Sequence, residues 1–354
     1  MKHYLRLRKF VEENKDKLLW KTISQNPDAI DILTLNQDKI IWWGLSSNPS
    51  AMELLEANPN MIRWKWLSKN PNPRAVTLLK TKFNKINWME LSGNAATAAI
   101  ELLEANQDMI SWRWLSGNPN DKAIKLLEAN QDMIDWVELS QNPGPAAIDL
   151  LTRNQDMIDW GGLSRNPNAL ELLEANPDKI HWEDLSCMPD AIHILEQNKD
   201  NIYWEGLSTN EDAAAIKLLE ANPDMIDWDA LSYNAAAIKL LEANPDMIDW
   251  EALSYNENAI ELLEANPNMI DWEALSYNPS AIELLEANTD KIDWDELSSN
   301  PSIFEYDYQA MKDHMYGSGI CEALMANRFH PSNHTKWRDW GFEDMLPPSE
   351  IVKE

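Results

Sequence analysis

The sequence is built on one short unit that recurs thirteen times. The unit is clearest over residues 269–288, MIDWEALSYNPSAIELLEAN, and one tryptophan marks each copy: Trp20, Trp42, Trp64, Trp88, Trp112, Trp136, Trp160, Trp182, Trp204, Trp228, Trp250, Trp272 and Trp294. Seven of the twelve spacings between these marker tryptophans are 22 residues and five are 24. A fixed short period indicates a solenoid, in which each unit buries its apolar side against the next.

Asn-Pro dipeptides divide each unit into segments. Fourteen of the nineteen prolines follow an Asn. Asn is a preferred helix N-cap, proline suits the first helical position, and the residue before a proline leaves the α region. In the unit around Trp272 we therefore expect one helix over 279–287 and a second, opened by Asn288, over 289 to about 299. The high Ala, Leu and Glu content favours helices over a β-containing, leucine-rich type of repeat.

These features predict an all-α protein, a right-handed-type α-solenoid of about thirteen short two-helix repeats with N- and C-terminal caps. Residues 1–19 form the N-terminal cap, 20–300 the repeat array, and 301–354 a C-terminal cap or docking segment. Helices of about ten residues are marginal alone, so stacking has to stabilise them. With about 8–10 Å per helix layer, the array would extend over roughly 100 Å or more.

Two polar positions recur through the repeats. Ser24 and its twelve equivalents never vary, while the Asn columns that begin at Asn26 and Asn14 are each broken once, by Met188 and Lys82. Thirteen nucleophilic serines would each need their own base, which argues against catalysis. We therefore expect these serines to bond the backbone near the end of a helix, and the Asn columns to form caps and corner ladders.

Charge is distributed unevenly along the chain. The net charge is −29; residues 1–120 contain 16 basic and 12 acidic residues, and residues 121–354 contain 14 and 47. The acidic part should repel phosphates and favour a basic protein surface, so no nucleic acid partner is expected. A column of aspartates beside the markers would hold cations only loosely, because the oxygen-rich loop of a calcium site is absent. We expect no cofactor and no metal.

Two cysteines exclude a disulfide framework. No apolar run approaches the roughly 20 residues needed to cross a membrane, and the first 15 residues lack the apolar core of a signal peptide. The expected location is the cytoplasm, with no membrane partner.

Three tryptophans are additional to the thirteen markers. Trp43, Trp66 and Trp114 occupy the two positions after a marker, where other repeats carry mostly polar residues. Exposed tryptophan beside Lys and Arg is typical of interaction hot spots, so we interpret these residues as candidates for binding a protein. Partial burial between neighbouring repeats and stacking on nucleobases are the alternatives.

Three tyrosines recur in successive repeats. Tyr233, Tyr255 and Tyr277 each follow the invariant serine, at a position that varies elsewhere. A row of tyrosines at the spacing of the repeats predicts a recognition strip for an extended protein segment. Recent duplication of one unit explains the row equally well.

The tandem Trp-x-x-Leu-Ser-x-Asn-Pro-x-Ala-Ile-x-Leu-Leu-Glu units resemble repeat proteins encoded by large DNA viruses of algae and amoebae. The end of the chain, LMANRFHP at 324–331 and WRDWGF at 337–342, is similar to the tail of many of these viral proteins. The resemblance implies a viral repeat protein made in the host cytoplasm. It implies no defined activity.

Catalytic motifs such as a P-loop, Gly-x-Gly-x-x-Gly or His-Glu-x-x-His are missing from the sequence. His314, Cys321, His330 and His334 gather near the end, but without the paired spacing usual in zinc sites. The sequence thus predicts a non-catalytic scaffold for protein–protein interaction. A structural component of a virion, and an adaptor that recruits host machinery through residues 301–354, are the alternatives.

Overall fold

The computed structural model describes residues 4–317, which fall into two compact units. The larger unit is Leu7–Ile303, and the other is formed from residues before Leu7 and after Ile303. Strands β1 (Leu5–Leu7) and β2 (Phe304–Tyr306) pair in a two-stranded sheet, and helix α27 (Tyr308–Gly317) follows β2. The larger unit is helical throughout, which confirms the predicted all-α solenoid.

Every repeat has a Trp helix, which begins at the marker tryptophan. The thirteen Trp helices are α2 (Trp20–Gln25), α4 (Trp42–Ser47), α6 (Trp64–Ser68), α8 (Trp88–Ser92), α10 (Trp112–Ser116), α12 (Trp136–Ser140), α14 (Trp160–Leu163), α16 (Trp182–Ser186), α18 (Trp204–Thr209), α20 (Trp228–Tyr233), α22 (Trp250–Tyr255), α24 (Trp272–Tyr277) and α26 (Trp294–Leu297).

A second helix carries most of the remaining apolar residues. The second helices are α1 (Lys9–Glu12), α3 (Ile30–Leu35), α5 (Met52–Ala57), α7 (Pro73–Lys80), α9 (Thr97–Glu104), α11 (Asp121–Glu128), α13 (Pro145–Arg153), α15 (Leu170–Glu174), α17 (Ile192–Gln197), α19 (Ala213–Ala221), α21 (Ile238–Glu242), α23 (Ile260–Ala265) and α25 (Ile282–Ala287). In the five 24-residue repeats the second helix has eight or nine residues. In most shorter repeats a three-residue 3₁₀ turn, such as Pro27–Ala29, directly precedes the second helix, so the helical segments have similar total lengths and the two extra residues lie in the corner before the helix.

The helix expected over 279–287 is present. Asn278 accepts a hydrogen bond from the Ser280 N–H, a 3₁₀ turn covers Pro279–Ala281, and α25 continues from it. Asn and proline therefore act as N-cap and first helical residue, as predicted.

The helix expected over 289–299 is wrong in its first half. The side-chain amide of Asn288 donates to the Leu284 carbonyl at 2.9 Å, so Asn288 ends α25 instead of opening the next helix. A turn and a short extended link follow, and α26 begins only at Trp294. Its N-cap is Asp293, which accepts from two backbone N–H groups. The carboxylate satisfies the free N–H groups that every helix start exposes.

The invariant serine joins neighbouring repeats. The Ser140 hydroxyl donates to the Trp136 carbonyl at 2.7 Å and accepts the Asp159 N–H of the next repeat at 3.0 Å. All thirteen serines are fully buried. The predicted structural role of these serines is confirmed. Because each hydroxyl also accepts a hydrogen bond from the next repeat, alanine could not replace the serine without loss of that bond.

The first Asn column forms a ladder along the repeats, interrupted at Met188. The Asn142 side-chain amide donates to the Ser116 and Asn118 carbonyls of the preceding repeat at 2.8 and 2.9 Å, and its oxygen accepts the Gly144 N–H at 2.9 Å. Because buried backbone groups have to be hydrogen-bonded, one asparagine satisfies three of them at each joint. The predicted corner ladder is thereby confirmed.

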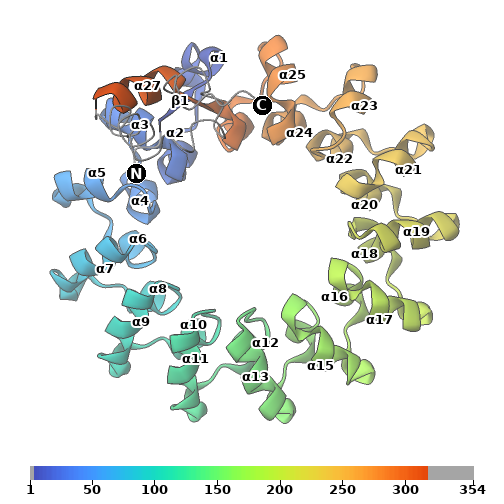
Figure 1. The fold of residues 1–354 in the computed structure, drawn as a ribbon, viewed down its shortest axis with the longest axis horizontal. Coiled ribbons are helices and arrows are strands. Elements are labelled where there is room, and N and C mark those ends of the chain that lie inside the picture. Colours follow the sequence, from blue (N-terminus) through green and yellow to red (C-terminus); the bar gives the residue numbers. More distant parts are fainter. Residues whose placement is uncertain (1–3, 318–354) are drawn as a thin grey trace, which may run out of the picture. The chain divides into compact units, whose positions relative to one another are not determined.

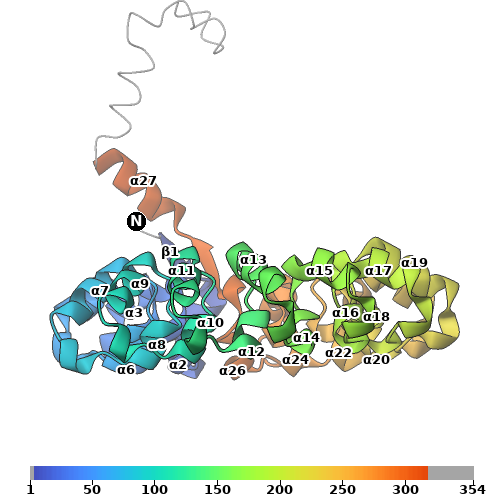
Figure 2. The same cartoon turned by 90° about the horizontal axis from the view of Figure 1, so that it is seen from below.

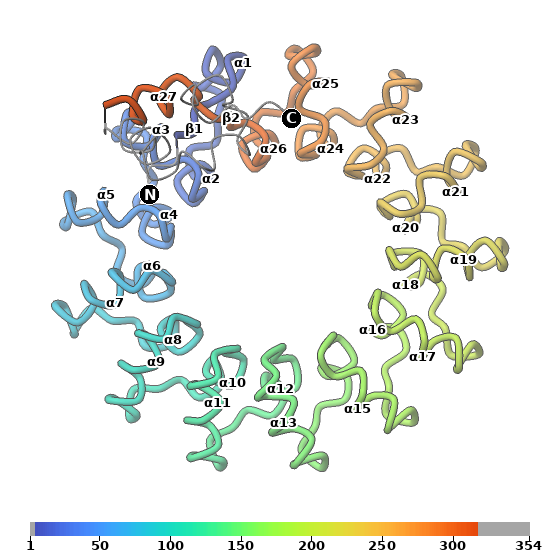
Figure 3. The backbone as a smooth tube through the Cα atoms, viewed as in Figure 1, coloured from blue at the N-terminus to red at the C-terminus, as the bar shows by residue number. Residues whose placement is uncertain are grey.

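The two ends of the larger unit bond to each other. Figures 1 and 3 show the repeats arranged in a ring, with the blue N-terminal helices beside the orange last repeats. The Arg8 N–H donates to the Ile303 carbonyl at 2.9 Å, and the Leu19 N–H donates to the Ser298 hydroxyl at 2.7 Å. The second of these bonds is the same serine joint that links all other neighbours.

Helix α1 therefore occupies the second-helix position of the thirteenth repeat, whose Trp helix is α26. Two further equivalences support this assignment. Asn14 donates to the Phe10 carbonyl at 2.8 Å, as Asn288 does at the end of α25. The Lys17 ammonium lies 4.8 Å from the Trp294 ring centroid, just as Lys291 covers the preceding marker. Residues from Leu7 onward thus complete a repeat, where we expected a cap over an open end.

The elongated array that we expected is therefore wrong. Thirteen Trp helices spaced by about 8–10 Å close a circle of about 35–40 Å between opposite helix axes. The Trp helices form the inner row and the second helices the outer row (Figure 3), and the larger unit is a flat band when seen edge-on (Figure 2).

Within residues 4–317, the joint between the ends, which we call the seam, lacks the asparagine ladder bonds, as does the joint at Met188. Asn26 keeps its bond from the Asp28 N–H, but among the described residues it makes no bond to the carbonyls of the thirteenth repeat. The Trp20 indole N–H is also buried at the seam without a partner in the described part of the chain. An unsatisfied buried donor costs about 1–3 kcal/mol, which destabilises the seam relative to a joint in which this N–H is bonded.

Candidate functional site

The Trp helices turn one side toward the second helices and the other toward the inside of the ring. In α22, Leu253 and Ser254 are fully buried, whereas Glu251 is exposed and Tyr255 is half-buried. Residues one, two and five positions after the marker lie on the opposite side of the helix from the buried pair. Since the Trp helices form the inner row (Figure 3), these three positions make up the inner face.

All six aromatic residues singled out in the sequence are on this inner face. The structure divides them into three places: Trp43 and Trp66 on α4 and α6, Trp114 on α10, and the three tyrosines on α20, α22 and α24. Trp43 and Trp66 touch, with ring centroids 4.9 Å apart. Trp114 lies apart from both groups and is 51% exposed.

Neighbouring repeats fit together on the inner face by pairing a small residue with a larger one. A Cβ atom added to Gly93 would lie 3.4 Å from the Trp114 ring, and one added to Gly206 would lie 2.9 Å from the Cys187 sulfur. In both pairs one residue is five positions after its marker and the other is two positions after the next marker. The sequence contained this complementarity, but only the geometry shows which positions to compare.

The three tyrosines form one contiguous strip, the Tyr ledge. The ring centroids of Tyr233 and Tyr255 are 6.0 Å apart and those of Tyr255 and Tyr277 are 6.1 Å apart. Ala252 and Ala274, two positions after their markers, are almost completely buried. As in the pairs at Gly93 and Gly206, a small residue here faces a larger one of the neighbouring repeat, so these alanines leave room for the tyrosine rings. The predicted row of tyrosines therefore exists as an aromatic surface open to solvent.

Carboxylates surround the Tyr ledge. Asp229, Glu251 and Glu273 are exposed one position after their markers, on the same helices. Residues 194–303 contain 24 acidic and 4 basic residues, and within the described chain none of them forms an ion pair. Over residues 4–317, the acidic residues of this arc therefore have no compensating ion pairs.

Burial raises the pKa of Tyr255, and the nearby negative charge of Glu296 adds to the effect. A hydrogen bond to Glu205 raises the pKa of Tyr203, which lies on the same acidic arc. Both shifts stabilise the neutral phenol. These tyrosines therefore remain hydrogen-bond donors at neutral pH.

Lysines surround the two touching tryptophans. The Lys21 ammonium is 5.5 Å from the Trp43 ring centroid, and Lys65 and Lys69 are 5.9 and 4.9 Å from that of Trp66. We call these five residues the Trp–Lys cluster. Contacts of this kind contribute about 0.5–1 kcal/mol at exposed sites.

The column of aspartates beside the markers has a structural role. Asp135, Asp159, Asp227, Asp249, Asp271 and Asp293 each accept a backbone N–H at the start of a Trp helix. Within residues 4–317, no group of three or more His, Cys, Asp or Glu is arranged to hold a metal ion. Cys321, His330 and His334 lie outside the described residues.

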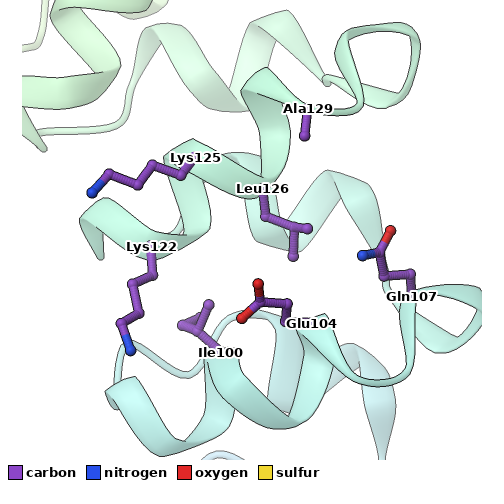
Figure 4. Close-up of a pocket in the computed structure, with 7 residues that line it drawn as sticks. All are labelled: Ile100, Glu104, Gln107, Lys122, Lys125, Leu126 and Ala129. Carbon is purple, nitrogen blue, oxygen red and sulfur yellow. The ribbon is translucent and has the colours of Figure 1, made fainter.

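Shallow grooves separate successive second helices on the outer face. The larger one, about 390 Å³, lies between α9 and α11, where Glu104 and Leu126 point into it (Figure 4); its other lining residues are Ile100, Gln107, Lys122, Lys125 and Ala129. A smaller groove of about 230 Å³ lies between α15 and α17. Because a ring spaces its outer row more widely than its inner row, such grooves follow from the curvature. They are less distinctive than the inner face.

Comparison with protein families, with curated proteins and with solved structures found no match. Over the described residues, the helices are all too short or too polar to span a bilayer.

Proposed function

We propose that this protein is a non-catalytic scaffold that binds a protein partner on the inner face of its ring. The observation that carries the proposal is the Tyr ledge, a contiguous aromatic strip exposed where the fold needs only small or polar residues. Other repeats place Gly93, Gly117 or Ser299 at the same position. Tyrosine is enriched at interfaces because its rigid, amphipathic ring gives contact area at low entropic cost.

The chemistry of the arc defines the partner. Asp229, Glu251 and Glu273 have no ion-pair partner in the described chain, so the arc attracts positive charge. We propose a basic, extended protein segment that lies along α20, α22 and α24, with Lys or Arg side chains on the carboxylates and on the tyrosine faces. Arginine suits both contacts, since its guanidinium pairs with carboxylates and stacks on aromatic rings.

The acidic arc of the inner face also argues against a duplex threaded through the ring. An opening of about 35–40 Å between axes would admit one, but phosphates would meet the uncompensated carboxylates. A viral origin, a place in the host cytoplasm or the virion, and recruitment through residues 301–354 stay predictions; residues 318–354 lie outside the described part.

The test is binding of a fluorescein-labelled peptide, five repeats of Arg-Ser-Gly, measured by anisotropy. We expect saturable binding that weakens with added salt. The double variant Glu251→Gln/Glu273→Gln on the inner face should bind about 5–10-fold more weakly, from about 0.5 kcal/mol or more per exposed charge. The matched control Glu261→Gln/Glu283→Gln changes the same charge on the outer helices of the same repeats and should bind normally.

The ledge itself is tested by Tyr233→Ala/Tyr277→Ala, with Phe83→Ala, another half-exposed aromatic residue, as control. We expect about tenfold weaker binding for the tyrosine variant only. Equal losses in the inner and outer charge variants would mean general attraction to an acidic protein, and the proposal would be wrong.

A further inference from the structure

The Trp–Lys cluster is a positively charged and aromatic surface on an otherwise acidic protein. Helices α2, α4 and α6 and the C-cap residue Lys69 carry it, and these three helices contain no Asp or Glu. In the described chain, only Lys65 of its three lysines forms an ion pair, at 3.7 Å to Glu90. Among the described residues Lys21 and Lys69 form no ion pair and their ammonium groups lie over tryptophan rings, so they can bind carboxylates.

The two tryptophans are not required by the repeat. At the position of Trp43 other repeats have Lys21, Gly161 or Asp229, and at that of Trp66 all other repeats except the one with Trp114 have small or acidic residues. Both rings are partly exposed and meet at 4.9 Å with a tilt of 40°. They offer an apolar platform large enough for one anchor side chain, flanked by cations.

The extent of the surface limits what it can bind. It covers three repeats, about 20–30 Å at 8–10 Å per helix. Glu90 borders it on one side, and across the seam Asp295 and Glu296 border it on the other. An extended chain of about six to nine residues spans this length. A longer polyanion would run onto carboxylates at both ends.

We propose that the Trp–Lys cluster binds a short acidic protein segment that carries one aromatic or aliphatic anchor. The anchor lies on Trp43 and Trp66, and the carboxylates of the segment pair with Lys21 and Lys69. This site goes beyond the basic partner of the Tyr ledge, because it lies in other repeats and selects the opposite charge. The inner face thus offers two arcs with opposite preferences.

The experiment uses the full chain and a fluorescein-labelled decapeptide with four Glu around a central Phe-Leu pair. Anisotropy should show saturable binding that falls with salt. Lys21→Glu/Lys69→Glu should weaken it at least tenfold, and Trp43→Ala/Trp66→Ala by a similar factor. Lys217→Glu/Lys239→Glu, which reverses the same number of exposed lysines on outer helices, should leave it unchanged; circular dichroism would verify that each variant is folded.

Three results would overturn the inference. One is the absence of saturable binding to the unchanged protein. Another is equal binding of the peptide with Gln in place of Glu, which would leave only an apolar patch. The third is equal or tighter binding of a ten-nucleotide oligo(dT), since stacked bases and phosphates would then be the ligand. The variant Tyr233→Ala/Tyr277→Ala should bind the acidic peptide normally. The inference about the Trp–Lys cluster can therefore be wrong while the proposed function of the Tyr ledge is right, and the proposed function can be wrong while the inference is right.

Discussion

Closure of the ring can be tested at the seam by the substitution Ser298→Ala. The Ser298 hydroxyl accepts the Leu19 N–H at 2.7 Å, and in the described chain the seam lacks the asparagine bonds that support every other joint except the one at Met188. A neutral hydrogen bond contributes a net free energy of about 1 kcal/mol, which corresponds to about a fivefold change in an equilibrium constant. We therefore expect Ser298→Ala to favour opening of the seam about fivefold.

Hydrogen exchange at the Arg8 amide reports this opening, because that N–H donates to the Ile303 carbonyl across the seam. Its exchange should be about fivefold faster in Ser298→Ala. The matched control is Ser140→Ala, which removes the same joint inside the ring. There the neighbouring repeats remain linked by the chain and by the Asn142 ladder. The control should lower the global free energy of unfolding by about 2 kcal/mol. It should leave the exchange rate of the Arg8 amide the same as in the unchanged protein.

The closed state itself is measured by spin-label distances, with Cys187 and Cys321 replaced by Ser. Labels at residues 16 and 290 occupy equivalent positions in repeats that adjoin across the seam, as labels at 268 and 290 do within the ring. The two pairs should give the same distance. A separation of many tens of ångströms for the first pair, or equal Arg8 exchange in both serine variants, would refute the reasoning.

Three further predictions concern individual side chains. Asn142→Ala removes three buried hydrogen bonds and should destabilise the protein by about 3 kcal/mol in urea unfolding, whereas Asn26→Ala, which loses one, should cost about 1 kcal/mol; equal values would contradict the ladder. Burial raises the pKa of Tyr255 above its ordinary value of 10.0, so the contribution of this residue to stability is complete below pH 10.0 and is lost as pH rises through its folded pKa. Tyr255→Phe should therefore reduce the loss of stability between pH 9 and pH 11. An unchanged dependence of stability on pH in this range would contradict the prediction. Asp249→Ala removes an N-cap and should cost about 1 kcal/mol in thermal unfolding, while a neutral effect would mean that the cap is not needed.

Much of the local architecture was predictable from the sequence. The marker spacing gave the repeat, Asn-Pro placed the start of the helix over 279–287, and the lack of variation at Ser24 and its equivalents indicated a backbone hydrogen bond. The helix starts beside the markers were predicted less well, because Asn288 was taken as an N-cap. Asn can end a helix as well as begin one, and only the hydrogen bond to the Leu284 carbonyl distinguishes the two roles.

The candidate site was predictable in its residues but not in its grouping. Trp43 and Trp66 are 23 residues apart, and nothing in the sequence shows that they touch while Trp114 lies alone. The contact depends on how far one Trp helix rotates relative to the next. Small residues at other joints, such as Gly93 and Gly206, likewise fit a larger residue of the neighbouring repeat, and packing of this kind involves two repeats at once.

By itself the sequence determined the repeat, its two helices and its polar joints, since these depend on bonds between residues within about 26 positions of each other. Only the tertiary structure decided that the array closes. Closure follows from a small rotation at each joint, added over thirteen repeats, and from the bond between Leu19 and Ser298, which are 279 residues apart. The tertiary structure also decided which side of each Trp helix forms the inner face, because a helix has an inner side only when the row of helices that contains it is curved.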